Sequence, residues 1–212
     1  MIEVLYEDEY CIVVNKPPHL LTHPSKETKE KANLLFQTRD QINTYLYPIH
    51  RLDRQTSGII IFGKNKKMIR DLQSIWHTDQ VRKMYMALIN EKDLESGCYD
   101  FALKGDNGNF LEAKTKFTAI KHFNETTLVE IEIFTGRRHQ IRRHFARRMQ
   151  HLVGDRKYGK KKMNDYYQEH FGLKRLFLHA HNFSFYHSIK EEQITVECPL
   201  PQELQNLIQN LS

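Results

Sequence analysis

The chain has 212 residues, which is long enough for one domain with a sizeable hydrophobic core or for two small domains. Its 32 Lys and Arg residues exceed its 26 Asp and Glu residues and give a formal net charge of +6 at pH 7, which indicates a polyanionic partner only where the basic residues are concentrated. The three cysteines are far apart and in no CxxC spacing, which argues against a disulfide framework or a zinc finger, and no apolar run approaches the length that crosses a bilayer.

The first residues, MIEVLYEDEY, are acidic and lack the basic and then apolar pattern of a signal peptide. Together with the cysteine usage, this start predicts a cytoplasmic protein. Residues 4–18 predict two short strands around a turn at Glu7–Glu9, ended by Pro17 and Pro18. Residues 22–33 are polar without periodicity and predict a loop.

Residues 50–58 read HRLDRQTSG and place Asp53 between Arg51 and Arg54. The glycine-bounded apolar run that follows, residues 58–64, predicts a strand buried on both faces. Neighbouring guanidinium groups favour the charged form of a carboxyl group. The pattern therefore indicates either a structural ion pair or an anion that is kept deprotonated in order to react.

The rest of the sequence alternates strand and helix signals without a regular β-α-β order. Further strands are predicted at residues 83–90, 127–134, 175–187 and 193–199, and helices at residues 65–78, 139–150 and 201–211. Many strands with interspersed helices favour an α+β fold around a mostly antiparallel sheet. No repeat, linker or domain boundary interrupts the chain, so we predict a single domain over residues 1–212.

Two of these elements have a face that the sequence defines. The strand at residues 127–134 should bury one face, made of Val129, Ile131 and Ile133. The helix at residues 139–150 has an apolar stripe expected to face the core, made of Ile141, Phe145 and Met149. That orientation would leave some of the helix arginines at the edge of the core, where a carboxylate could meet them.

The basic excess is concentrated between Gly136 and Lys162, where the single acid is Asp155. A solvated helix face normally mixes both signs of charge, whereas a phosphate-binding surface does not, because each neutralised phosphate adds affinity. The eleven basic residues are Arg137, Arg138, Arg142, Arg143, Arg147, Arg148, Arg156, Lys157, Lys160, Lys161 and Lys162.

Several kinds of catalytic site lack their signature. His179 and His181 alternate on a predicted strand, but no third metal ligand is near them in sequence. No GxSxG, Cys–His, Walker or dinucleotide-binding pattern is present. Asp53 therefore remains the candidate nucleophile or base, with neither metal nor cofactor expected. A glycosidase would need a second positioned carboxylic acid, which the sequence does not indicate.

Tyr85, in KMYMAL, has two interpretations. A tyrosine on a strand is usually half-buried core with its hydroxyl bonded to a neighbour. An aromatic ring is also what a protein uses to stack an unstacked base.

The HRLDRQTSG segment closely resembles the HRLDxxTSG signature of the RluA-type pseudouridine synthases. Five further segments resemble elements of that family in the same order, namely NKPP before the signature and KMYMAL, TGRRHQIRRH, GDRKYG and LFLHA after it. Within the family, the sequence is most similar to the tRNA pseudouridine synthase C branch, which modifies uridine 65 of tRNA. The resemblance implies an α+β fold with a mixed, mostly antiparallel sheet flanked by helices and a catalytic cleft across the sheet.

The resemblance also implies a role for each matching residue. Asp53 would be the essential aspartate, and Arg142 would form the ion pair that keeps Asp53 ionised. Tyr85 would stack on the uracil, and Arg51 would help to displace the target base from its stack. Leu178 would supply an apolar wall of the base pocket.

The implied activity is conversion of a uridine in tRNA into pseudouridine without cofactor or metal. Arg138, in the third matching segment, would contact the RNA substrate. Met1 begins almost directly at the first catalytic-domain strand, so we expect no S4-like domain and a monomer that recognises RNA with this domain alone. The alternatives are a 23S rRNA pseudouridine synthase of the same family and an RNA-binding protein without catalysis.

Overall fold

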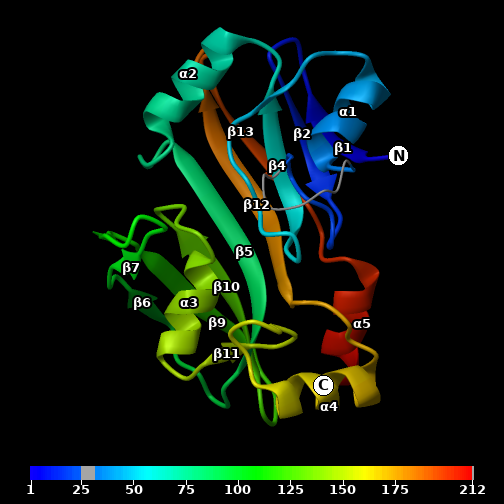
Figure 1. Ribbon diagram of the computed structural model, residues 1–212, viewed down its shortest axis with the longest axis vertical. Coiled ribbons are helices and arrows are strands. Elements are labelled where there is room, and N and C mark those ends of the chain that lie inside the picture. Colours follow the sequence, from blue (N-terminus) through cyan, green and yellow to red (C-terminus); the bar gives the residue numbers. More distant parts are fainter. Residues whose placement is uncertain (25–31, 212) are drawn as a thin grey trace. The chain divides into compact units, whose positions relative to one another are not determined.

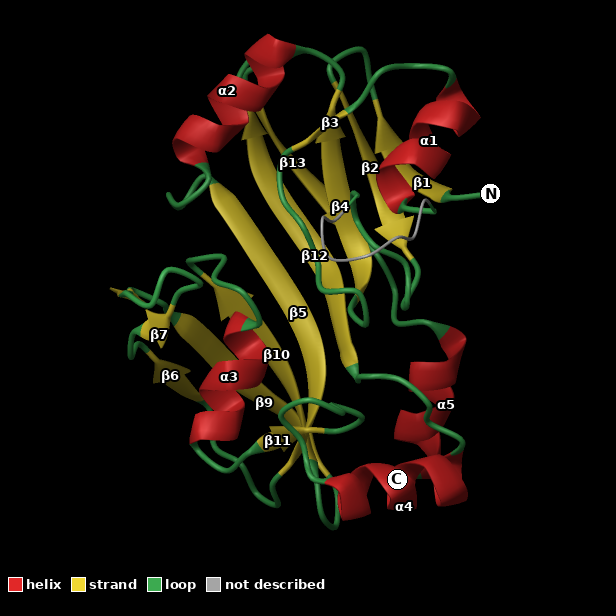
Figure 2. Cartoon of the chain, in the orientation of Figure 1, coloured by secondary structure: helices red, strands yellow, loops and turns green. Residues whose placement is uncertain are grey.

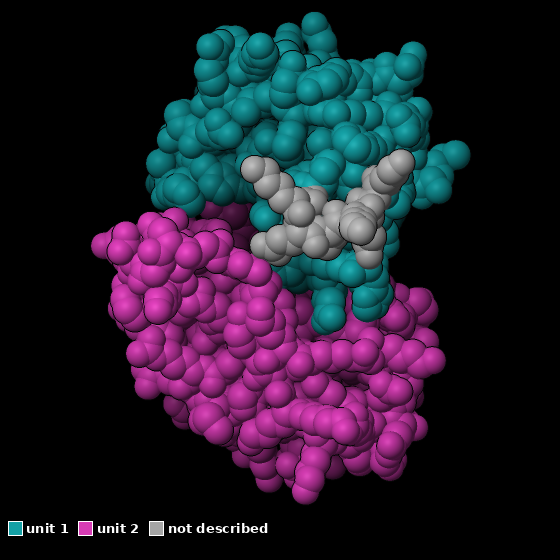
Figure 3. All heavy atoms as spheres, in the orientation of Figure 1, with its two compact units in different colours: residues 1–82, 180–198 teal, residues 83–179, 199–212 magenta. Residues whose placement is uncertain are grey.

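The computed structural model describes residues 1–24 and 32–211, which form two compact units (Figures 1 and 3). Unit 1 comprises Met1–Arg82 and Ala180–Cys198, and unit 2 comprises Lys83–His179 and Pro199–Ser212. Both units combine strands with helices (Figure 2), and the predicted α+β fold with a mostly antiparallel sheet is confirmed. A single domain over the whole chain stays a prediction.

Unit 1 is built on strands in the order β1, β2, β4 and β12, with β3 paired to β4 and β13 paired to β12. Its elements are β1 (Glu3–Glu7), β2 (Cys11–Lys16), α1 (Leu34–Ile42), β3 (Tyr47–Pro48), β4 (Ser57–Gly63), α2 (Lys66–Ile75), most of β12 (Leu178–His187) and β13 (Glu192–Glu197). The N-terminal pair of strands is confirmed, and β1 and β2 pair antiparallel. Every residue of β4 is buried, as predicted for a strand covered on both faces.

The two helices of unit 1 begin at asparagine caps. The side chain of Asn65 accepts the N–H of Met68 at 2.9 Å and starts α2, which lies within the predicted helix at residues 65–78. Asn33 accepts the N–H of Phe36 at 3.0 Å and starts α1, a helix that we did not predict. Residues 25–31 of the predicted loop at residues 22–33 lie outside the described residues.

Unit 2 contains strands in the order β5, β10, β9 and β6, with β11 paired to β5, and a separate hairpin of β7 and β8. Its elements are β5 (Val81–Asn90), β6 (Gly97–Tyr99), β7 (Leu103–Lys104), β8 (Phe110–Leu111), β9 (Thr115–His122), β10 (Thr127–Ile133), α3 (Gln140–Arg147), β11 (His151–Leu152), α4 (Lys161–Phe171) and α5 (Gln202–Asn210). The apolar face predicted for residues 127–134 is confirmed, since Val129, Ile131 and Ile133 of β10 are buried.

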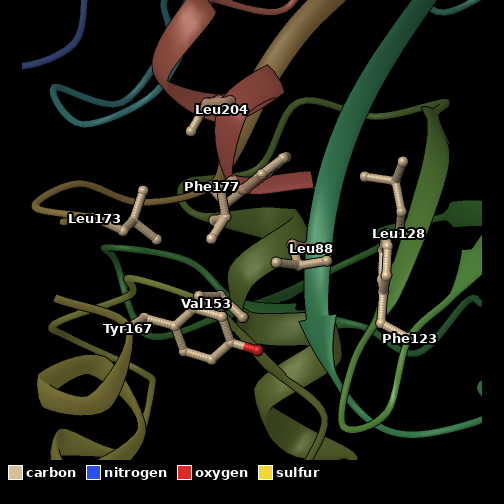
Figure 4. Packing of buried hydrophobic residues seen from close by; sticks show 9 residues of the cluster. Leu88, Phe123, Leu128, Val153, Tyr167, Leu173, Phe177 and Leu204 are labelled. Atoms are coloured by element: carbon tan, nitrogen blue, oxygen red, sulfur yellow. The ribbon is translucent and has the colours of Figure 1, made fainter. Parts of the chain in front are cut away.

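The core of unit 2 joins the sheet to α4 and α5 (Figure 4). Leu88 of β5 and Leu128 of β10 come from the sheet, and Tyr167 and Leu204 come from the two helices. The other members of the cluster are Phe123, Val153, Leu173, Phe177 and Leu207. This packing anchors two helices whose outer faces carry polar and charged side chains.

Helix α3 is shorter than predicted, and one residue of its apolar stripe does not face the core. Ile141 and Phe145 are buried as expected, but Met149 is 64% exposed. The N–H groups of Met149 and Gln150 bond back to the carbonyls of Ala146 and Phe145, at 3.0 and 3.1 Å, which closes the helix with a Schellman motif. That motif turns Met149 into the left-handed region at φ 63° and points its side chain outward.

The composition-based exclusions agree with the structure. All three cysteines are free, with Cys11 and Cys198 buried and Cys98 exposed. Among the helices of the described residues, none has the length and apolar character needed to span a membrane.

Candidate active site

Asp53 lies in the loop of unit 1 between β3 and β4, where its side chain is half-buried. Its backbone carbonyl accepts the N–H of Thr56 at 3.1 Å, which closes a tight turn directly before β4. Because β4 is buried along its whole length, the end of the turn is fixed to the centre of the unit 1 sheet.

The backbone on both sides of Asp53 is also fixed. The hydroxyl of Thr22 donates to the carbonyl of Leu52 and accepts its N–H, both at 3.2 Å. The fully buried ammonium of Lys16 donates to the carbonyl of Arg54 at 3.2 Å and to the carbonyls of Pro17 and Leu20 at 2.9 and 2.8 Å. A carboxyl group on such a loop keeps one position.

The two arginines that flank Asp53 in sequence are both exposed. The Nε atom of Arg54 donates to the carbonyl of His19 at 2.9 Å, which adds another bond between the two loops. Arg51 is exposed on the same loop of unit 1, two residues before Asp53.

Gly58 ends the signature segment because no side chain fits there. Its φ is +110°, and a Cβ atom would lie 2.2 Å from the carbonyl oxygen of Ala180 in β12. The segments HRLDRQTSG and LFLHA therefore contain residues that touch backbone to backbone within unit 1.

Arg142 in α3 of unit 2 forms a buried bidentate pair with Asp155. Its Nε and Nη2 atoms donate to the two carboxylate oxygens of Asp155 at 2.8 and 2.9 Å, and the side chains are 6% and 1% exposed. Burial alone would raise the pKa of Asp155, but the hydrogen bonds and charge of Arg142, with two backbone N–H groups, outweigh it and lower that pKa. Both partners are thus charged at neutral pH.

The GDRKYG segment is a turn organised around Asp155. One carboxylate oxygen accepts the N–H groups of Lys157 and Tyr158, at 2.9 and 3.0 Å. At Gly154, where φ is +78°, a Cβ atom would lie 1.9 Å from the carbonyl oxygen of Arg175. The Arg142 guanidinium lies over the Tyr158 ring, 5.0 Å from its centroid. The turn therefore contacts the Arg142 guanidinium twice, with the Asp155 carboxylate at one edge and the Tyr158 ring at one face.

Tyr85 and Lys83 point to the same side of β5, two residues apart. Tyr85 is 7% exposed and is paired in register with Ile131 of β10. Burial lowers the pKa of Lys83 to about 8, and the charge of Glu132 opposes this shift in part. Both side chains therefore place polar groups on the buried face of β5.

The last two predicted residues also belong to unit 2. Leu178 is buried at the start of β12, and its carbonyl accepts a long hydrogen bond from Arg175 at 3.5 Å. Arg138 is exposed and pairs with Asp106 at 3.0 Å. Asp53 and Arg51 thus lie on one loop of unit 1. The other four predicted residues lie on four separate segments of unit 2, namely Tyr85, Arg142, Leu178 and Arg138.

Three residues that position the site were missed in the sequence. Asp155 is the single acidic residue in a basic segment, and this isolation is the sequence signal that indicates an ion pair. Lys16 stood in a matching segment, but a lysine gives no sequence sign that it will be buried. Tyr158 carried no signal beyond its place in GDRKYG.

One group of described residues could offer three metal ligands, namely Asp8, Cys11 and His187 of unit 1. The carboxylate of Asp8 already accepts the Tyr6 hydroxyl at 2.7 Å and lies 3.0 Å from the Lys190 ammonium. A cation bound there would be repelled by that ammonium. The cluster is accounted for as a buried polar network that joins β2 to the end of β12.

Comparisons with known proteins identify the family of this chain. A sequence model of RNA pseudouridylate synthase matches residues 10–147. The tRNA pseudouridine synthase C of Vibrio cholerae is 30% identical over 98% of this chain and 95% of its own length, and that of Pasteurella multocida is 34% identical over the same shares. The solved structure of human RNA Pseudouridylate Synthase Domain Containing 4 has the same fold, with a TM-score of 0.79, 23% identity and coverage of 99% of this chain and 92% of that one.

The match covers β2 to α3 and includes the Asp53 loop, Tyr85 and Arg142. The chain belongs to the RNA pseudouridylate synthases. It is therefore an enzyme that isomerises uridine within RNA, as the sequence resemblance implied.

Proposed function

We propose that this protein converts a uridine of tRNA, at position 65, into pseudouridine with Asp53 as its essential residue and no cofactor. The substrate class is supported by relatives named tRNA pseudouridine synthase C, which align with nearly the whole chain. We further propose that it acts in the cytoplasm as a monomer.

The reaction breaks the bond between N1 of uracil and C1′ of ribose, turns the base, and joins C5 to C1′. The proton on C5 leaves and N1 gains one, so no co-reactant is consumed. Asp53 must be an anion whether it attacks the sugar, attacks the base or removes a proton. The target base must also leave its helix, which costs a few kcal/mol that RNA contacts have to offset.

Arg142 is proposed to hold Asp53 ionised. Asp155 bonds the Nε and Nη2 atoms of the guanidinium and thereby fixes its plane and orientation. A guanidinium held in this way is a rigid, permanently charged partner for a carboxylate. Tyr85 would stack against the uracil, Leu178 would form an apolar wall of the pocket, and Arg51 would help to displace the target base from its stack.

The observation that carries the proposal is the fixed backbone on each side of Asp53. Thr22 holds Leu52, Lys16 holds Arg54, and the turn to Thr56 closes the loop. A surface loop with no task does not need a fully buried ammonium for one of its carbonyls. A reactive carboxylate does need one fixed position.

The first test is Asp53→Asn, measured by mapping pseudouridine with carbodiimide and primer extension on tRNA and 23S rRNA from cells that carry each version. We expect the variant to lose one tRNA site completely while purified variant protein still binds tRNA, because the amide keeps the shape and loses the anion. Normal modification by the variant would refute the role of Asp53.

The same map decides between substrates. A lost site at position 65 of tRNA supports the proposal, and a lost site in 23S rRNA would keep the chemistry and replace the substrate. If deletion of the gene removes no pseudouridine, the RNA-binding alternative gains support.

A further inference from the structure

Unit 2 contains a cavity of about 390 Å³ between the β7–β8 hairpin and α3. Its polar and aromatic lining is Lys104, Phe110, Arg143, Arg147 and Tyr158. None of the described residues that line it is acidic. The volume falls in the usual range of small-molecule sites.

Phe110 lines this cavity, and 67% of its surface is exposed. The hairpin turn is closed by a bond from the Gly105 N–H to the Asn109 carbonyl at 2.7 Å. Phe110 follows that bond directly. The backbone that carries Phe110 is therefore closed into a defined hairpin, and the exposed ring is accessible to a flat partner.

Arginines of α3 and of the turn before it fasten the hairpin. Arg143 donates to the carbonyl of Lys104 at 2.9 Å and to that of Arg138 at 3.3 Å. Arg138 in turn pairs with Asp106 in the hairpin turn at 3.0 Å. Arg147 lies one helical turn further along α3 and places its guanidinium 4.9 Å from the Phe101 centroid. The lining of the cavity therefore combines cationic side chains of α3 and Lys104 with the exposed ring of Phe110.

The cavity adjoins the proposed catalytic arginine through one shared residue. Tyr158 lines the cavity, and its ring lies under the guanidinium of Arg142. The Tyr158 hydroxyl is also bonded to Nδ1 of His139 at 2.9 Å. A molecule in this cavity would thus lie one side chain away from Arg142.

We propose that this cavity binds an unpaired nucleotide of the RNA substrate other than the target uridine, with its base stacked on Phe110 and its phosphates near Arg143, Arg147 and Lys104. The proposal rests on the proposed function, because it takes RNA as the substrate. An aromatic ring beside guanidinium groups is the combination that binds an unstacked base and its phosphates. The enzyme would then bind an unpaired nucleotide of the RNA in addition to the flipped target uridine.

The test is steady-state kinetics and equilibrium binding with an unmodified tRNA transcript. We expect Phe110→Ala to raise KM and Kd roughly tenfold, which is within the range for loss of one base stack, with kcat nearly unchanged. Phe110→Trp should restore wild-type KM, because indole also stacks. Ile120→Ala, which removes a 53% exposed side chain on β9 of the same unit, should change neither constant.

A second variant tests the phosphate contacts without touching the ring. Arg147→Gln should lower the slope of log Kd against log salt by about 0.7, the value for one phosphate contact on a single strand. If Phe110→Ala and Arg147→Gln both match wild type, the cavity is not an RNA site. If the wild-type protein makes no pseudouridine in any RNA, the proposed function fails, and that outcome is distinct from normal turnover by the Phe110 variant.

Discussion

Arg142 and Asp155 show how one buried charge depends on another. Their side chains are 6% and 1% exposed, so neither charge has water as an alternative partner. Removal of one partner takes a bidentate charge pair away from a buried site, and breaking such a pair costs more than the pair gains by forming. Because Asp155 also accepts the N–H groups of Lys157 and Tyr158, the same carboxylate sets the shape of the turn beneath Arg142.

We predict that Asp155→Asn lowers the free energy of unfolding by about 3–5 kcal/mol at neutral pH, because the amide removes the charge that faces Nε and Nη2 of the buried Arg142 guanidinium. Urea unfolding measures this difference. The folded-state pKa of Asp155 is below its ordinary value, so its contribution is complete above that value and is lost as the pH falls through the lower, folded-state pKa. The difference between wild type and variant should therefore shrink below about pH 4.

Asp165→Asn is the matched control, since Asp165 is an exposed acid on α4 of the same unit. It should change the unfolding free energy by less than about 0.5 kcal/mol. Equal effects of the two substitutions would show that net charge, and not the buried pair, decides the result.

Single residues could be predicted from the sequence where they belong to a recognisable motif. Asp53, Tyr85 and Arg142 lie in segments with a recognisable pattern, and the family match covers all three. The residues that hold them were not predictable in the same way. Arg142 and Asp155 are 13 positions apart on different elements, and no periodicity links them. Lys16 acquires its role only from three carbonyls that the folded chain brings to it.

At the scale of one element, α3 shows how a helix end overrides a helical pattern. Spacing alone placed Met149 on the buried stripe with Ile141 and Phe145. The Schellman bonds end the helix at Arg147 and leave Met149 at φ 63°, a conformation that costs a residue with a Cβ atom about 1–2 kcal/mol.

We predict that Met149→Gly raises the free energy of unfolding by about 1 kcal/mol, because glycine adopts positive φ without strain. Urea or thermal unfolding measures the change. Met149→Ala is the control, since alanine removes the same exposed side chain and keeps the strain. An equal gain from both substitutions would attribute the effect to the side chain and contradict the backbone explanation.

Elements whose apolar residues have a clear periodicity were predicted from the sequence, and elements with a narrow apolar face were not. β4 and β10 have continuous or alternating apolar residues, and both lie where the sequence placed them. α4 begins with two lysines and buries only Tyr167 among its described side chains, so its sequence has no apolar stripe that would predict a helix. β12 starts three residues later than expected, because Arg175 to Phe177 precede the strand and supply buried groups to unit 2.

At the scale of the whole molecule, the net charge does not show how unevenly basic and acidic residues are distributed along the chain. Residues 136–162 contain eleven of the 32 basic residues and one of the 26 acidic residues. The rest of the chain is therefore slightly acidic, with 21 basic and 25 acidic residues. A modest value of +6 can thus coexist with a surface that binds phosphates strongly.

We predict that replacement of Lys160, Lys161 and Lys162 by Gln lowers the slope of log Kd against log salt for tRNA by about two, because each phosphate contact contributes about 0.7–0.9. Filter binding at several salt concentrations measures the slope. The control replaces Lys66, Lys67 and Arg70 of α2 by Gln, which makes the same change in net charge in unit 1. Equal slopes for the two triple variants would contradict a localised phosphate surface.

Both units are assembled from two separate stretches of chain, and this has a consequence for synthesis. Unit 1 needs residues 180–198 for most of β12 and for β13, and unit 2 is completed by residues 199–212, which include α5. On a ribosome the Asp53 loop emerges early, but the strand that contacts Gly58 emerges more than a hundred residues later. The nascent chain therefore cannot complete unit 1 before residues 180–198 have left the exit tunnel, and unit 2 is completed only after that.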